Sequence, residues 1–255
     1  MIAGADTPLA AVLHPSPNFG PRRGSGRPDM LLLHYTGVAD AGQAIAWLSR
    51  PESQVSAHYV IDEDGRITQL VAESMRAWHA GVAVWAGETD INSASVGIEI
   101  HNPGHELGYR EFPEAQLRGL EALSRDIVAR HRIRPERVLA HSDVAPLRKR
   151  DPGEKFPWAR LAAVGIGHWV PPEPLEGGPH PAVGAGEDEE RIAEAQGLLA
   201  AYGYGLAATG VADPLTSGVV CAFQRHFRPQ RADGRIDRST LATLKRLLAA
   251  LPGGA

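Results

Sequence analysis

The stretch of sequence that decides the fold is residues 93–143, SASVGIEIHNPGHELGYREFPEAQLRGLEALSRDIVARHRIRPERVLAHSD. It opens with a short apolar run at 93–104 and closes with another at 134–143. Short apolar runs bounded by Gly, Pro or Asp are typical of buried strands. Between them, apolar residues recur at helical spacing behind Pro113, namely Leu117, Leu120, Leu123 and Ile127. The order strand–helix–strand predicts an α/β domain.

A third apolar run, DMLLLHYTG at residues 29–37, has the same character. Each of the three runs leads into polar residues, which are His34 in the first, Glu99 in the second and His141 in the third. Ligands of α/β sheets gather beyond the carboxyl ends of the strands. We therefore expect these three side chains to lie at one edge of the sheet.

Residues 56–71, SAHYVIDEDGRITQLV, predict a β-hairpin. Apolar and polar residues alternate on both sides of Asp64-Gly65, a pair that favours a tight turn. A hairpin places an antiparallel pair beside the parallel strands, so we expect a mixed central sheet flanked by helices.

Composition divides the chain into two domains. Residues 1–172 carry the α/β pattern, residues 173–187 are rich in Pro and Gly and predict a linker, and residues 188–255 predict a small three-helix bundle. The second of these helices is expected to begin with Asp213 as N-cap and Pro214 as its first residue. The candidate metal ligands fall in the first domain, so we expect the chemistry there.

The charge and cysteine counts exclude several kinds of protein. The 255 residues include 26 basic and 30 acidic side chains, with a net charge of −4, so no basic excess predicts nucleic-acid binding. The single cysteine, Cys221, excludes an internal disulfide and a thiolate metal cage. No run approaches the ~18 apolar residues of a membrane-spanning helix. The N-terminal residues do not read as a complete signal peptide.

His34, His141 and Asp151 are candidate metal ligands because a single sheet edge would bring them together. Zinc binds imidazole nitrogen and carboxylate oxygen, and a catalytic zinc keeps three protein ligands. The alternative is that these are ordinary polar residues at strand ends. Three other histidines compete as ligands, and spacing does not exclude them: His58, His79 and His101.

Five motifs together resemble the zinc-dependent N-acetylmuramoyl-L-alanine amidases of type 2, whose fold is shared with peptidoglycan recognition proteins. They are LLLHYTG (31–37), SAHYVIDEDGRI (56–67), AWHAG (77–81), NSASVGIEIHNPG (92–104) and HSDVAPLRKRDPG (141–153). The resemblance covers roughly residues 25–170, with the motifs in order and at compatible spacing.

The resemblance implies a Zn²⁺ site of His34, His141 and Asp151. It implies that Glu99 is the general base and that Lys149 is a cation that stabilises the transition state. The substrate bond would be the amide between the lactyl group of muramic acid and L-alanine, in peptidoglycan or in muropeptides. Some relatives carry a catalytic tyrosine where this chain has Ala57, so proton transfer is expected to depend on Glu99.

Other residues of these motifs have weaker expected roles. Trp78 and His79 are expected to line the substrate groove, and Asn92 to bind peptide carbonyls. His58 is interpreted as a donor to a metal ligand, with a buried core histidine as the alternative. Asp143 is expected either to orient His141 or to stabilise a turn.

Two interpretations stay open for the arginines on either side of Lys149. Arg148 and Arg150 would point away from Lys149 on an extended segment. They are expected to be solvated or to contact carboxylates of the substrate.

Residues 188–250 resemble the small peptidoglycan-binding domain often attached to wall hydrolases. Such a tether raises the local concentration of a polymeric substrate, so we expect a monomer that acts on peptidoglycan in the cell envelope or periplasm. The cytoplasm stays open as an alternative because no signal peptide is visible. Two other functions compete, namely a non-catalytic peptidoglycan recognition protein and a metal-dependent hydrolase of another amide, such as a peptidase.

Overall fold

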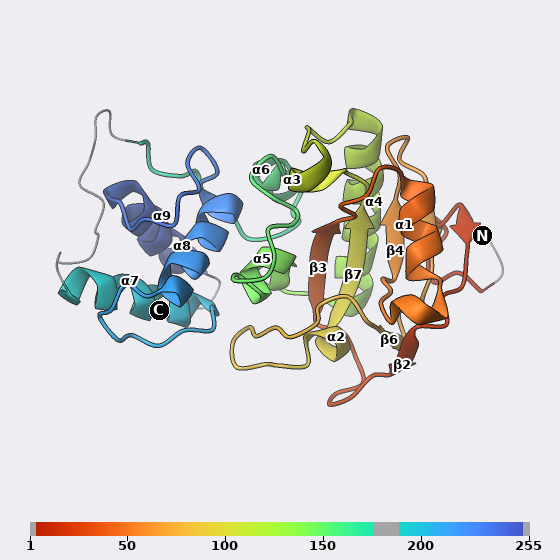
Figure 1. The fold of residues 1–255 in the computed structure, drawn as a ribbon, viewed down its shortest axis with the longest axis horizontal. Coiled ribbons are helices and arrows are strands. Elements are labelled where there is room, and N and C mark those ends of the chain that lie inside the picture. The colour runs from red at the N-terminus through yellow and green to blue at the C-terminus, as the bar shows by residue number, and fades with distance from the viewer. Residues whose placement is uncertain (1–3, 176–188, 252–255) are drawn as a thin grey trace.

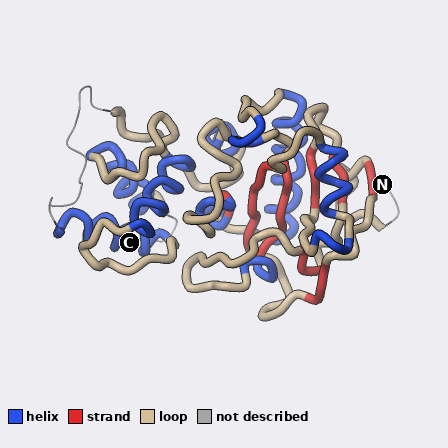
Figure 2. The backbone as a smooth tube through the Cα atoms, in the orientation of Figure 1, coloured by secondary structure: helices blue, strands red, loops and turns tan. Residues whose placement is uncertain are grey.

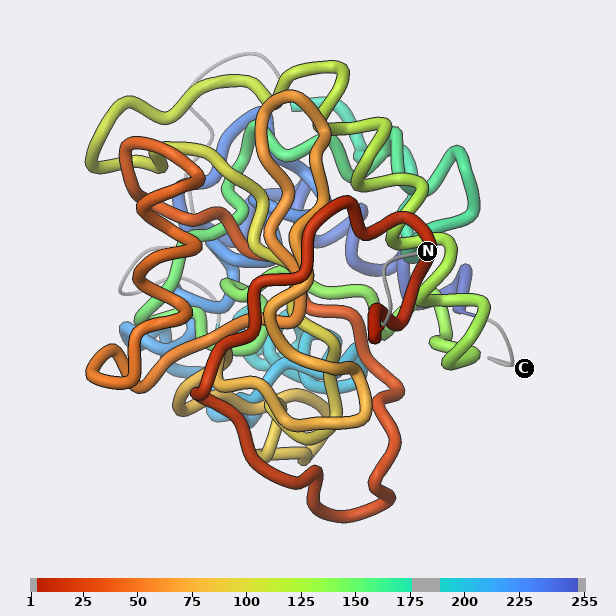
Figure 3. Tube along the Cα trace, turned by 90° about the vertical axis from the view of Figure 1, so that its right-hand side faces the viewer, coloured from red at the N-terminus to blue at the C-terminus, as the bar shows by residue number. Residues whose placement is uncertain are grey.

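The computed structural model describes residues 4–175 and 189–251. A central sheet with its helices forms one half of the molecule, and the three C-terminal helices form the other (Figures 1 and 2). Figure 3 views the molecule from the right-hand side of Figure 1, with the N-terminal residues toward the viewer and the C-terminal helices behind the sheet.

The described residues form a six-stranded sheet in the order β1-β5-β4-β7-β3-β8. Its strands are β1 (Val12–Leu13), β3 (Met30–Tyr35), β4 (Tyr59–Ile61), β5 (Ile67–Gln69), β7 (Ser95–Ile100) and β8 (Val138–Ala140). β3 pairs in parallel with β7 and with β8, whereas β4 and β5 are antiparallel. A small antiparallel pair joins β2 (Phe19–Pro21) and β6 (Met75–Ala77). The predicted mixed sheet is confirmed.

Helix α4 (Glu114–His131) covers one face of the sheet (Figure 1). It begins directly after Pro113, and its predicted apolar stripe packs against alternate residues of the strands, including Leu31 and Leu33 of β3. Burial of this stripe, rather than helix propensity alone, stabilises α4. Helix α1 (Ala41–Leu48) lies on the other face beside β4. The shorter helical elements are η1 (Pro51–Ser53), α2 (Ile91–Ala94), α3 (Gly104–Leu107), η2 (Pro135–Arg137), α5 (His141–Val144) and α6 (Trp158–Ala163).

The hairpin between β4 and β5 turns at Gly65, as the sequence predicts. Gly65 has a φ of +84°, and a Cβ atom there would lie 2.5 Å from the carbonyl oxygen of Ala115 in α4. Only glycine fits this left-handed and crowded position.

The C-terminal unit consists of α7 (Glu189–Tyr202), α8 (Pro214–Phe227) and α9 (Arg238–Ala249). Asp213 caps α8, since its Oδ1 accepts a hydrogen bond from the Thr216 amide at 2.7 Å, and Pro214 follows as expected. Asp237 caps α9 in the same way. Their carboxylates satisfy amide groups that have no partner within the helix.

One hydrophobic cluster joins the two halves of the molecule. It contains Leu32 and Leu139 from the sheet together with Phe223 and Phe227 of α8. Trp85 inserts its ring edge-on against Tyr202 and Tyr204, with centroid separations of 5.9 and 4.8 Å. The C-terminal helices therefore complete a core that the sheet begins.

The predicted linker, 173–187, lies mostly outside the described residues, so the division into two domains stays a prediction. Its described beginning is held against α9, because the Glu173 amide donates to Thr243 Oγ1 and the Ser239 hydroxyl donates to the Glu173 carbonyl. In the described ranges, no helix combines the length and apolarity needed to cross a bilayer.

Candidate metal centre and active site

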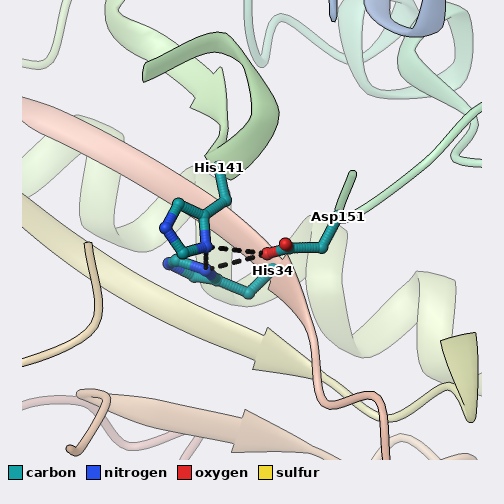
Figure 4. A group of neighbouring side chains, drawn as sticks. All are labelled: His34, His141 and Asp151. Atoms are coloured by element: carbon teal, nitrogen blue, oxygen red, sulfur yellow. Dashed lines mark hydrogen bonds and ion pairs between the residues drawn. The ribbon is translucent and has the colours of Figure 1, made fainter. Parts of the chain in front are cut away.

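Three side chains converge at the carboxyl end of the sheet (Figure 4). His34 lies near the end of β3, His141 is the first residue of α5, and Asp151 closes the following loop. Their ligand atoms form a triangle: the two Nδ1 atoms are 2.9 Å apart, and Asp151 Oδ2 lies 3.1 Å from His34 Nδ1 and 3.0 Å from His141 Nδ1.

This triangle fits a shared cation. Tetrahedral coordination with ligand bonds near 2.05 Å separates neighbouring ligand atoms by about 3.3 Å, slightly more than the separations seen here. All three residues are buried, and among the described residues they are the one group of three with metal-ligand spacing. Burial and the neighbouring His141 lower the pKa of His34 to about 4, which keeps its imidazole neutral and able to bind a metal.

The outer nitrogens of both histidines also have partners. His141 Nε2 lies 3.0 Å from the carbonyl oxygen of Ala80, to which it donates, and this leaves Nδ1 as the free lone pair. His34 Nε2 lies 3.1 Å from Nδ1 of His79. Partners of this kind fix the tautomer and orientation of a ligating imidazole.

The ring of His79 rests on the backbone of Gly97 in β7. A Cβ atom at Gly97 would lie 2.6 Å from the His79 ring. A side chain at this position would push His79 away from His34, so the VGIEI motif needs its glycine for packing. His79 is 9% exposed and lines the pocket. Its Nδ1 also contacts the outer nitrogen of His34, Nε2.

The loop that carries two of the three candidate ligands is closed at its base. The Ser142 amide donates to the Asp151 carbonyl at 3.0 Å, and the amides of Arg148 and Lys149 both donate to the Ala145 carbonyl. His141 and Asp151 are therefore held at a fixed separation by backbone hydrogen bonds near the ligands themselves.

Glu99 lies beside the candidate metal centre on the same face of the sheet. β3 and β7 pair in register so that His34 is opposite Glu99. The Oε2 atom of Glu99 is buried and has no hydrogen-bond partner. Burial, and then the charge of Asp151, raise the pKa of Glu99 well above its ordinary value. A carboxyl group in this state is suited to exchange protons near neutral pH.

Lys149 belongs to the same site. It lines the pocket, and its positive charge acts against burial in setting the pKa of Glu99. Its backbone is held in the closed loop between His141 and Asp151, where its amide donates to the Ala145 carbonyl. The site thus combines a buried carboxyl group, two imidazoles, an acidic ligand and a cation.

These groups line a pocket of about 780 Å³. Trp78 and His79 lie on its wall, as predicted for a substrate groove, together with Trp47 and Val55. A pocket of this size accommodates a ligand of several residues or sugar units.

Two predicted site residues lie elsewhere. Asn92 is buried, and its Oδ1 accepts hydrogen bonds from the amides of His79 and Ala80 at 3.0 and 2.8 Å. It does not line the pocket, so its side chain holds the AWHAG segment instead of binding peptide carbonyls. His58 Nδ1 accepts from the Gly97 amide, and Nε2 donates to the Met75 carbonyl. Its ring lies edge-on to His79 at a centroid separation of 5.7 Å and has no hydrogen bond to His34, His141 or Asp151 among the described contacts. This environment fits the core alternative.

Asp143 does not orient His141. Its Oδ2 accepts from the Ala140 amide at 2.8 Å and from His226 Nδ1 at 2.7 Å, and its Oδ1 accepts from the Tyr204 hydroxyl at 2.8 Å. The expected turn-stabilising role is therefore present. The contact with α8 was not predicted, because no local pattern in the sequence signals which distant side chains complete a buried carboxyl group.

The flanking arginines differ from each other. The Arg148 guanidinium donates to the carbonyls of Ala80 and Val82, which were not among its expected partners. Arg150 is exposed and lies 3.8 Å from Glu106. His101 contacts Thr36 and is not part of the metal triangle.

Comparisons with known proteins agree with this geometry. The model of the N-acetylmuramoyl-L-alanine amidase family matches residues 24–154, and that of a peptidoglycan binding domain matches residues 188–244. The N-acetylmuramoyl-L-alanine amidase AmiD of Escherichia coli is 38% identical over 236 residues, which cover 86% of this chain and 82% of AmiD.

Two solved structures are similar over nearly the whole chain. AmiD from E. coli, in complex with anhydro-N-acetylmuramic acid-L-Ala-D-γ-Glu-L-Lys, has a TM-score of 0.74 and 37% identity, covering 89% of this chain and 92% of that one. AMPDH3 from Pseudomonas aeruginosa, in complex with an anhydromuramic pentapeptide, has a TM-score of 0.71 and 33% identity, covering 88% and 91%.

Proposed function

Because this chain belongs to the N-acetylmuramoyl-L-alanine amidase family, we propose that it hydrolyses the amide bond between muramic acid and L-alanine in peptidoglycan or muropeptides. The observation that carries the proposal is the triangle of His34, His141 and Asp151 beside the unpartnered carboxyl group of Glu99. A recognition protein without catalysis would have no need for this complete set, and the muramoyl peptide named for the AmiD complex supplies the substrate class.

Zn²⁺ is the proposed metal, held by His34, His141 and Asp151. The donor set of two neutral imidazoles and one carboxylate suits zinc. When bound, zinc supplies Lewis acidity that polarises the amide carbonyl and lowers the pKa of water.

Glu99 is the proposed general base and acid. It would accept a proton from the attacking water and later donate it to the nitrogen of the departing L-alanine, which must leave as a neutral amine. The raised pKa of Glu99 brings its proton affinity closer to that of the groups it must serve. Its Oε2 has no hydrogen-bond partner among the described residues, so no protein donor competes for the proton it would carry.

Lys149 is proposed to stabilise negative charge on the former carbonyl oxygen. Such charge appears as water adds to the amide, so a fixed cation nearby favours the transition state over the ground state. The closed loop holds the Lys149 backbone between two metal ligands, which limits the reorganisation needed during the reaction.

The polymeric wall is proposed as the physiological substrate, with the cell envelope as the compartment. The family match of the C-terminal unit to a peptidoglycan binding domain supports this proposal. We also propose that the chain acts as a monomer, since the described site is completed within one chain.

Mass spectrometry of digested sacculi, alongside a soluble anhydro-muropeptide, tests the function. The expected products are peptides with a free L-alanine amine, and the purified protein is expected to hold about one zinc per chain. Cleavage at a different bond, or sugar release without peptide release, would contradict the proposal. A zinc-loaded protein that leaves both substrates intact would favour recognition without catalysis.

A further inference from the structure

Helix α8 of the C-terminal unit forms part of the wall of the active-site pocket. Three residues of α8 at spacings of three and four line the same pocket as His34, Glu99 and Lys149; they are Gly218, Cys221 and Arg225. Residues 3 and 4 apart share one face of a helix. The C-terminal unit thus presents one face of α8 directly to the proposed reaction site.

This face of α8 is held firmly against the loop that carries the candidate metal ligands. His226, next to Arg225, donates to Asp143, and its ring stacks on Trp158 at a centroid separation of 3.6 Å. A Cβ atom at Gly218 would lie only 2.7 Å from the Leu147 side chain, so this loop side chain packs directly on the backbone of α8. The position of Arg225 relative to the pocket is therefore fixed by packing.

Arg225 itself has unused hydrogen-bonding capacity. Its side chain is only 16% exposed, yet its Nε atom is buried without a hydrogen-bond partner. The nearest carboxylate oxygen, Glu154 Oε2, is 3.9 Å away and lies 3.1 Å from His105 Nε2. A mostly buried guanidinium with an unpaired N–H is unfavourable unless a further acceptor completes it.

We propose that Arg225 binds a carboxylate of the peptide stem, so that the C-terminal unit helps select the substrate inside the active site. This inference rests on the proposed amidase function. Arg225 offers a planar fork of N–H donors, which pairs well with a carboxylate. The γ-linked glutamate of a muramoyl peptide leaves its α-carboxylate free, and the end of the peptide supplies a second candidate.

Neighbouring arginines are less suited to this role. Arg148 is occupied by the carbonyls of Ala80 and Val82. Arg150 is more than half exposed and lies near Glu106, so water screens its charge. Arg225 is the pocket arginine that combines burial with an unpaired donor.

Steady-state hydrolysis of three synthetic muramoyl peptides tests the inference. One substrate carries both free carboxylates, one has the glutamate α-carboxylate converted to a carboxamide, and one has an amidated C-terminus. With the unmodified protein, amidation of the carboxylate that Arg225 binds is expected to raise KM about 10-fold to 100-fold, with kcat little changed. The substrate that responds identifies which carboxylate is bound.

The Arg225→Gln variant is expected to lose this discrimination, and Arg225→Lys to recover part of it through charge alone. Arg246→Gln is the matched control, since Arg246 belongs to the same unit but pairs with Glu173 outside the pocket. Equal KM values for all three substrates with the unmodified protein, or full discrimination retained by Arg225→Gln, would overturn the inference. If the unmodified protein released no peptide from any of them, the amidase function itself would fail.

Discussion

Asp143 and His226 are 83 residues apart in sequence, and their side chains meet in a buried hydrogen bond of 2.7 Å. Asp143 lies two residues after the candidate ligand His141, and His226 belongs to the C-terminal helix α8. This contact, together with the shared hydrophobic cluster, makes the C-terminal unit a structural partner of the metal centre. A freely tethered wall anchor would lack both features.

The His226→Ala variant is expected to destabilise the whole chain. It removes one donor to the buried Asp143 carboxyl group and the ring that stacks between Trp158 and Phe227. The expected loss in free energy of unfolding is about 2–4 kcal/mol, measured by urea denaturation. His14→Ala, at an exposed position, is the control. A loss no greater than that of the control would contradict the structural role of this contact.

Truncation after Leu175 is expected to impair folding as well as wall binding. It would expose the sheet-side residues of the shared cluster, including Trp85, Leu139 and Val144. Large exposed apolar patches promote aggregation. Size-exclusion chromatography and calorimetry of the truncated chain should therefore show aggregates or a lowered melting temperature. A soluble and equally stable fragment would show instead that the two parts are independent.

The Glu99→Gln variant is expected to retain the metal and lose activity. The amide has nearly the shape of the carboxyl group but cannot shuttle a proton, so the rate should fall about 10²-fold to 10⁴-fold. Zinc content and peptide release from sacculi are the two measurements. Glu106→Gln changes an exposed carboxylate at the pocket edge and serves as the control. Near-normal turnover by Glu99→Gln would remove its assignment as base.

The Lys149→Gln variant is expected to lower kcat with little change in KM. Its cation is proposed to act on charge that develops only in the transition state, and loss of such a group costs about 10²-fold to 10³-fold. Lys245→Gln is the control, since Lys245 pairs with Glu194 and neither residue lines the pocket. A rise in KM alone would place Lys149 in substrate binding instead.

Acid is expected to destabilise the fold through Glu73. This carboxylate is 3% exposed and accepts hydrogen bonds from Arg130, His131 and Tyr59. Burial raises the pKa of Glu73, but these hydrogen bonds outweigh it and hold the pKa far below the ordinary value. A depressed pKa in the folded state stabilises the fold above the unfolded pKa of about 4.3 and loses that effect as pH falls.

Urea denaturation at pH 7 and pH 3 measures this dependence. The Glu73→Gln variant should lose about 1–3 kcal/mol at pH 7, because it removes charge-assisted hydrogen bonds to a buried group while Arg130 keeps its ion pair with Asp126. Its stability should also depend less on pH between these values. An unchanged pH dependence would assign the acid sensitivity to other carboxyl groups.

The elements that carry the site could be predicted from the sequence because their signals are local. The apolar runs that lead to His34, Glu99 and His141 form the strands β3, β7 and β8 respectively. Strand–helix–strand chirality and parallel pairing then bring their ends together without further information. Helix caps such as Asp213 are equally local.

Contacts between distant segments could not be predicted in the same way. From the sequence, Arg148 and Asn92 are expected to face solvent or substrate, yet each hydrogen-bonds to backbone groups between His79 and Val82. Arg148 still lines the pocket, whereas Asn92 does not. The approach of α8 to the pocket likewise depends on how two apolar surfaces pack, and neither surface specifies its partner by periodicity alone. Arg225 therefore had no visible role before the structure.

The amide of Ser142 and the carbonyl of Asp151 close the ligand loop into a ring at its base. The positions of His141 and Asp151 are therefore set by the chain itself and do not wait for an ion to arrive. Little conformational freedom is left to lose when a cation binds, so a preorganised ring of this kind favours tight capture.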